Sequence, residues 1–198
     1  MDKRKLHQIL VGLRQLRAGH LGIAFVVLLG LGVLLMRQNN LHMITLRNLV
    51  IQADEQNQNI PEALTNLRNY IAAHMNTGMG ERGIYLEHSY QRVYEGAVQG
   101  AIQNGSEQYK QADKTCRGMY GETSSFQAYA QCVADKTANV AAGITLPSAD
   151  LYRFNFVAPA WSPDVAGFTL LAAFLAGALL AGRFLLQAVV YALLRANR

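Results

Sequence analysis

The sequence has two stretches without a single charged residue, and this absence decides most of what can be read from it. Residues 18–36 carry no charge, and residues 165–182 carry none either, with apolar character resuming after Arg183 through Leu194. Each stretch approaches the ~20 residues that an α-helix needs to cross ~30 Å of hydrocarbon. We therefore expect two transmembrane helices on either side of a polar region.

Acidic residues are also absent from both apolar segments. Proton relays and ion pathways use intramembrane carboxylates, so this absence argues against a pump or a channel. Arg183 lies near the expected inner boundary of the second segment, from which its side chain can extend to the interface.

Sequence motifs of several enzyme classes are missing. The chain has no GxSxG and no P-loop, and its glycines at 78, 80 and 83 precede no βαβ pattern. His74, His88 and Glu87 are the only weak candidates for a metal site, because no pair of histidines has the HExxH spacing. We expect no catalytic residue, no metal and no cofactor, and hence a protein that is not an enzyme.

Basic residues are concentrated at the two ends of the chain. Residues 1–17 and 183–198 together carry a net charge of +7, and residues 37–164 carry −2, which gives +5 overall. Lysine and arginine beside a span resist translocation, so both termini should be cytoplasmic and the middle extracytoplasmic. Because the basicity belongs to the membrane flanks, no nucleic-acid partner is predicted.

These arguments divide the chain into five segments. The first span should stay in place as a signal-anchor, because Leu34, Leu35 and Met36 offer no small-residue cleavage site. The expected membrane anchors at the interfaces are Arg14, Arg17, Trp161 and Arg183. The segments are a cytoplasmic basic amphipathic segment (1–17), a first transmembrane helix (18–36), an extracytoplasmic helical domain (37–163), a second transmembrane helix (164–194) and a cytoplasmic tail (195–198).

Cysteine occurs only twice, as Cys116 and Cys132, and both fall in the expected exterior. An oxidising compartment would allow them to form a disulfide. Two unpaired buried thiols are the alternative, and their spacing disfavours a zinc pair.

Apolar spacing predicts a mainly α fold, with two transmembrane helices flanking an extracytoplasmic helical domain that carries a short extended arm. The first helix should run past the span to about Asp54 and break at 57–59, with Pro61 opening the next helix. Further helices are expected over 88–103 and 107–116 and from Ser125 to about Ala142, and extended segments over 84–86 and 152–157. The tyrosines suit the core of this domain, with a contact surface as the alternative.

Three glycines within residues 78–83 require a turn or positive φ. Polar residues on such a turn can serve recognition, and the candidates are His74, Asn76, Glu81, Arg82, Tyr85 and Tyr90. In the second span, small residues recur near helical spacing and favour close helix packing. They would contact either the first span of the same chain or an oligomer partner, and they are Ala173, Gly177, Ala181 and Gly182.

Residues 68–77, 83–90 and 161–164, together with the two spans and the cysteine pair, resemble a known group of proteins. These are uncharacterised two-span membrane proteins of ultrasmall, host-dependent candidate-phylum bacteria of the Saccharibacteria type, and the likeness covers nearly the whole chain. The resemblance implies a bacterial plasma membrane. It carries over no activity, cofactor or site residue.

We therefore expect a non-enzymatic binding or assembly subunit of the bacterial cell envelope. Its partners would be the lipid bilayer and either another envelope protein or a second copy of the chain. Two alternatives stay open. One is a membrane-tethered enzyme acting on cell wall or glycan, and the other is a sensory accessory subunit that lacks its own output domain.

Overall fold

The computed structural model describes residues 18–80, 83–104, 107–120, 125–138 and 146–196. The described residues form two compact units. The first unit contains residues 18–45, 68–78 and 157–196, and the second unit contains residues 46–67 and 79–156. The segment expected over residues 1–17, with Arg14 and Arg17, lies outside the described residues, as do Glu81 and Arg82.

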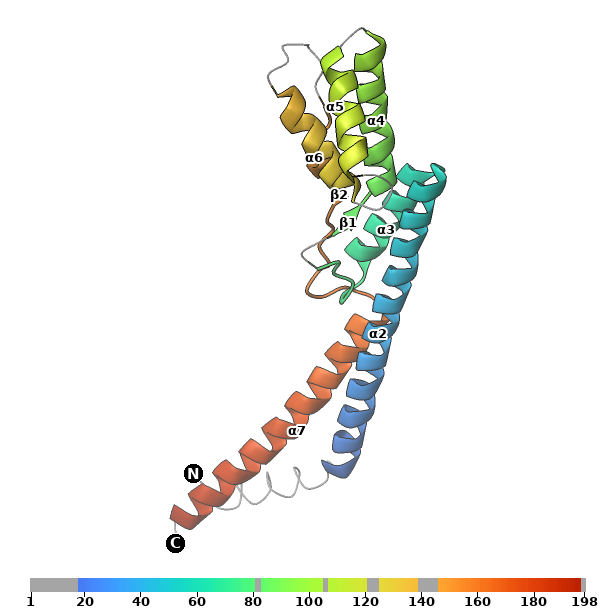
Figure 1. The fold of residues 1–198 in the computed structure, drawn as a ribbon. Helices are drawn as coiled ribbons and strands as arrows, with labels where there is room; N and C mark the ends of the chain where they lie inside the picture. The colour runs from blue at the N-terminus through green and yellow to red at the C-terminus, as the bar shows by residue number, and fades with distance from the viewer. Residues whose placement is uncertain (1–17, 81–82, 105–106, 121–124, 139–145, 197–198) are drawn as a thin grey trace. The chain divides into compact units, whose positions relative to one another are not determined.

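The described chain is mainly α-helical, as predicted (Figure 1). Its two strands pair antiparallel, with Ile84 opposite Phe154, so the expected extended arm is part of a small sheet. The elements are α2 (Ala18–Gln56), α3 (Ile60–Ala73), β1 (Ile84–Tyr85), α4 (Glu87–Gln103), α5 (Glu107–Tyr120), α6 (Phe126–Thr137), the 3₁₀ helix η1 (Ala149–Tyr152), β2 (Arg153–Phe154) and α7 (Val165–Ala196).

The break between α2 and α3 lies where the sequence placed it. Asn57 and Asn59 adopt positive φ values of 54° and 52°, a conformation that asparagine tolerates better than most residues. Pro61 occupies the first turn of α3, where its missing N–H leaves no hydrogen bond unmade. The turn is therefore set by local residue chemistry.

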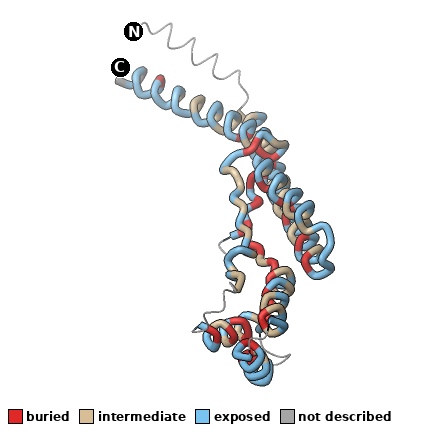
Figure 2. The backbone as a smooth tube through the Cα atoms, turned by 90° about the horizontal axis from the view of Figure 1, so that it is seen from above, coloured by how far each residue is buried: buried red, intermediate tan, exposed pale blue. Residues whose placement is uncertain are grey.

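Within the first unit, the two long apolar helices come close near the start of α7 and diverge toward its C-terminal end (Figure 1). A Cβ added at Gly32 of α2 would come within 2.5 Å of Leu170 on α7, so the missing side chain allows this approach. Most of the surface of both helices is nevertheless exposed. Only 6% of the most apolar window of α2 and 17% of that of α7 are buried within the chain. Figure 2 shows that the helix leading to the C-terminus is exposed along most of its length.

The start of α7 lies within one residue of the expected start of the second span at residue 164. The helix begins at Val165, so Pro163 precedes it, and Asp164 is the capping residue. Asp164 Oδ1 accepts a 2.7 Å hydrogen bond from the N–H of Gly167. Ser162 instead uses its hydroxyl to accept a hydrogen bond from Met75 N–H at 2.9 Å.

The core of the second unit is built from α4, α5 and α6 and is rich in tyrosine. Tyr90, Tyr94, Tyr109 and Tyr129 are each at most 6% exposed. The Tyr94 hydroxyl donates to the carbonyl of Ala130 at 2.8 Å, which gives the buried phenol a partner. The tyrosines of this unit therefore serve mainly as core residues.

Helix α6 starts where expected but ends earlier. Ser125 is its N-cap residue, but the Ser125 side chain makes no capping hydrogen bond. The helix ends at Thr137, its last buried residue, and most of the stretch between there and the expected end near Ala142 lies outside the described residues.

Candidate functional site

The three candidates for a metal site fall in two different units. His74, in the first unit, stacks on the ring of Tyr70 at a centroid distance of 4.0 Å, and its Nδ1 lies 2.9 Å from the Tyr70 carbonyl oxygen. Glu87 and His88 open α4 in the second unit. No group of three or more His, Cys, Asp or Glu side chains in the described parts of the chain is arranged to hold a metal ion.

The candidate recognition residues are likewise divided between the units. Asn76 adopts a φ of 61°, and its carbonyl accepts a hydrogen bond from the Asn40 side chain at 3.2 Å in the first unit. In the second unit, the Tyr85 ring lies 5.3 Å from the guanidinium of Arg153. Tyr90 is only 5% exposed, so its ring belongs to the core and is not presented on a loop.

The expected disulfide is present and joins α5 to α6. Cys116 and Cys132 are bonded with a Cα–Cα distance of 5.9 Å. Beside it, Asp113 Oδ1 accepts hydrogen bonds from the Tyr129 hydroxyl at 2.6 Å and from Arg117 Nε at 2.9 Å. Burial raises the pKa of Tyr129, and the bond to Asp113 raises it further, so the phenol keeps its proton and remains a donor.

Of the four small residues singled out in the second span, two are packed in the first unit. Ala173 is 2% exposed, and a Cβ on Gly177 would lie 3.0 Å from the ring of Phe25 on α2. Ala181 is exposed, and a Cβ on Gly182 would meet nothing within 4 Å. The close approach therefore involves the N-terminal half of the set and the chain's own α2.

Two of the expected membrane anchors are described, and Trp161 precedes α7 whereas Arg183 lies within it. Trp161 is 50% exposed just before the helix, and its indole N–H donates to the Gly167 carbonyl at 3.4 Å. Arg183 is half-buried, and its Nε and Nη1 atoms have no hydrogen-bond partner within the described part of the chain.

Asp54, near the end of α2, is the centre of a hydrogen-bond network that was not predicted from the sequence. It is 3% exposed and accepts hydrogen bonds from the N–H groups of His88 at 3.0 Å and Ser89 at 2.8 Å. Arg92 Nη2 lies 3.3 Å from the same carboxylate. Asp54 thus caps α4 from another helix, since Leu86, the N-cap residue of α4, supplies no side-chain hydrogen bond.

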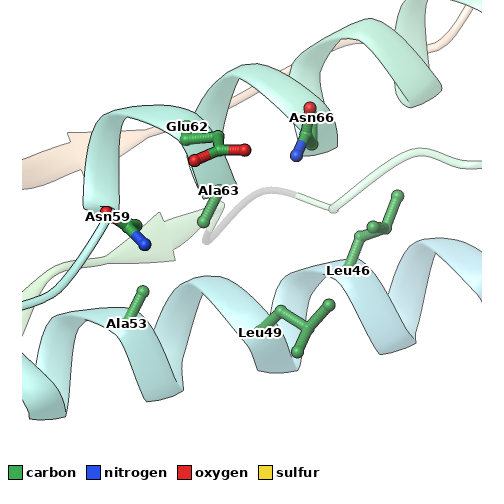
Figure 3. A pocket seen from close by; sticks show the side chains of 7 residues that line it. All are labelled: Leu46, Leu49, Ala53, Asn59, Glu62, Ala63 and Asn66. Atoms are coloured by element: carbon green, nitrogen blue, oxygen red, sulfur yellow. The ribbon is translucent and has the colours of Figure 1, made fainter.

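A groove between α2 and α3 is the best candidate for a binding site in the second unit. Figure 3 shows Leu46 and Leu49 projecting from α2 toward α3. The cavity volume is about 230 Å³. Half-buried apolar groups form the floor, whereas exposed polar side chains form the rim on the α3 side. The lining residues are Leu46, Leu49, Ala53, Asn59, Glu62, Ala63 and Asn66.

A second cavity of about 360 Å³ lies beside the tyrosine core. Tyr90 and Tyr94 form part of its wall, and the amides of Gln127 and Gln131 and the carboxylate of Asp150 also line it. The Tyr94 hydroxyl already donates to the carbonyl of Ala130, and the rings of both tyrosines belong to the core. The groove between α2 and α3 offers the more open apolar surface.

Comparison with known proteins returned no matching family model, no matching curated protein and no matching solved structure. The fold itself defines a mainly α protein with two long, exposed apolar helices and a cystine-linked helical unit.

Proposed function

We propose that this protein is a membrane-anchored, non-enzymatic binding or assembly subunit of the bacterial cell envelope. Its apolar helices anchor it, both termini lie in the cytoplasm, and residues 37–163 lie outside. Three observations support this arrangement. The apolar windows of α2 and α7 are largely uncovered by protein, basic residues flank the spans, and Cys116 and Cys132 form a disulfide of the kind favoured in oxidising compartments.

The observation that carries the binding role is the groove between α2 and α3. Its volume of about 230 Å³ is below the ~300–1,000 Å³ of small-molecule sites. A groove of this size suits one large apolar side chain of a protein partner. Leu49 remains 50% exposed on its edge, and Glu62 and Asn66 can hydrogen-bond to polar groups that surround the inserted side chain.

Site-specific photocross-linking in intact cells tests this role. A photoreactive phenylalanine analogue at Leu49 should give one adduct of defined mass with an envelope polypeptide. Val93 on α4 is the matched control, because it belongs to the same unit and is also 50% exposed. Equal adduct patterns at Leu49 and Val93 would show that the groove selects no partner.

Topology is tested separately with a membrane-impermeant maleimide on whole cells. We expect labelling of Lys110→Cys, whose side chain is 63% exposed in the second unit, and no labelling of Arg195→Cys until the cells are opened. Labelling of Arg195→Cys alone would reverse the proposed orientation.

A further inference from the structure

Opposite faces of α2 differ in how far their side chains are buried. Met43, Val50 and Asp54 are at most 5% exposed and mark the face that packs against other parts of the chain. Residues about nine positions apart lie on opposite sides of an α-helix, because each residue turns the helix by about 100°. The face opposite Val50 therefore carries Leu41, which is 54% exposed.

On this outer face, positions recur with alternating spacings of three and four from Ile23 to Ile51, and all of them are apolar except Arg37 and Asn48. Ile23, Val27, Gly30 and Leu34 begin the series, and all four are exposed. Leu41 and Ile44 continue it within the first unit, and Asn48 and Ile51 continue it in the part of α2 that belongs to the second unit. Alternating steps of three and four define the a and d positions of a heptad repeat, the pattern of a two-stranded coiled coil.

The part of this face that follows Arg37 requires an explanation, because the charged and amide residues from Arg37 to Asn40 mark the end of the apolar segment. Beyond them Leu41, Ile44 and Ile51 are 54%, 41% and 39% exposed. Lipid can cover the earlier part of the face, but large apolar side chains aligned on a water-exposed helix indicate a protein contact.

We propose that the outer face of α2 pairs with the same face of a second copy of this chain, forming a parallel two-stranded coiled coil that continues outward from the membrane. The parallel orientation rests on the proposed membrane insertion, because two copies inserted in one bilayer with the same topology present α2 in the same direction. In this register Leu41 and Asn48 are a positions, and Ile44 and Ile51 are d positions.

Asn48 favours a second copy over an unrelated helix. A single asparagine at an a position of a parallel pair hydrogen-bonds to its counterpart and fixes both register and two-stranded assembly. The two chains then align residue for residue, so that each Asn48 amide meets the other Asn48 and neither is left opposite an apolar side chain.

The a and d positions form the contact line between the two helices, here called the seam. The e and g positions that flank this seam are compatible with the pairing. Across a parallel dimer, Asn40 would face Thr45 and Arg47 would face Gln52, so no like charges meet there. Arg47 already donates to the carbonyl of Gly83 at 3.3 Å within its own chain. Arg37 and Glu55 occupy the d and a positions at the two ends of the apolar stretch, so each would lie near its counterpart in the second copy. Their long side chains can turn outward there to water or lipid headgroups.

Cysteine cross-linking of the full-length protein in native membranes tests the proposal. Ile44→Cys and Ile51→Cys should each form a covalent dimer on mild oxidation, because d-position side chains of a parallel pair face each other. Val93→Cys is the control, since Val93 is 50% exposed but lies on α4, outside both the outer face of α2 and the groove. It should remain monomeric, and Cys116 and Cys132 should stay paired with each other.

A second measurement covers disruption of the seam. The double variant Ile44→Lys with Ile51→Lys should lose the dimer in lipid nanodiscs, measured by single-particle mass, whereas Val93→Lys should keep it. Because both isoleucines are more than one-third exposed, the substitutions should leave each chain folded, which hydrogen exchange of α4 can verify.

Absence of a covalent dimer, equal cross-linking at Val93, or an adduct of Ile44→Cys or Ile51→Cys with a different polypeptide would each overturn the proposal. These results are separable from failure of the proposed function. If Lys110→Cys is labelled outside the cell while Ile44→Cys stays monomeric, only the dimer is wrong. If Lys110→Cys is not labelled outside, the proposed topology fails, and the argument for parallel orientation fails with it.

Discussion

Replacing Asp54 with alanine should release the N-terminal turn of α4 while leaving the rest of the second unit folded. The carboxylate accepts hydrogen bonds from the N–H groups of His88 and Ser89 at 3.0 and 2.8 Å. In Asp54→Ala both N–H groups lose this acceptor at a helix end where no local side chain replaces it.

The magnitude follows from the kinds of bond that are lost. Loss of an N-cap side chain costs about 0.5–2 kcal/mol, and hydrogen bonds to a charged group contribute roughly 1.5–3 kcal/mol. The ion pair with Arg92 adds little, because the Arg92 side chain is 36% exposed and solvent screens it. We expect a loss of about 2 kcal/mol for opening this turn, which corresponds to roughly 30-fold faster exchange at 1.4 kcal/mol per factor of ten.

Hydrogen exchange read at the His88 and Ser89 amides measures this opening directly. Asp54→Asn keeps an acceptor oxygen but loses the charge, so its effect should be smaller than that of Asp54→Ala. Glu55→Ala is the control, because Glu55 is exposed and adjacent on the same helix. Exchange at the two amides within threefold of wild type in Asp54→Ala, or equal acceleration in Glu55→Ala, would refute the capping role.

Two further predictions concern other fixed points of the fold. Reduction of the disulfide between Cys116 and Cys132, which are 16 residues apart, should destabilise the second unit by about 3 kcal/mol. Proteolysis after dithiothreitol treatment should therefore be faster, and unchanged proteolysis would contradict this prediction. Gly167→Ala should shift the fluorescence of Trp161 to longer wavelength, because a Cβ there would clash with the Ser162 carbonyl oxygen, whereas Gly182→Ala, in open space, should leave the emission unchanged. An equal response of both variants would contradict this reason.

Local residue chemistry predicted the elements well but did not predict all their contacts. The asparagine pair and Pro61 identify the break between α2 and α3, because these residues act through their own backbone preferences. Asp54 shows where such reasoning stops, since its partners lie more than thirty residues further along the chain. One signal was present: Asp54 follows Val50 by one helical turn, so both occupy the inward face.

The candidate binding site was missed for a related reason. The sequence predicts recognition at the glycine-containing turn, because polar residues on turns often serve function. The groove, however, needs two helices to be adjacent, and Leu49 and Ala63 belong to different ones. Helical spacing places Leu49 on one face of α2, but nothing in its local sequence states that α3 forms the opposite wall.

The stretch of α2 beyond Arg37 has apolar residues around most of its circumference, which made its pattern difficult to interpret as a single amphipathic stripe. A helix that packs on one side needs an apolar stripe of about 100°. Val50 marks that stripe, Leu49 and Ala53 line the groove, and Leu41 and Ile44 lie on a further exposed face. Packing within the chain accounts for the apolar character at Val50 alone. The apolar residues in the groove and on the outer face are explained if α2 contacts two additional partners, one on each of these surfaces. An assembly subunit requires such contacts.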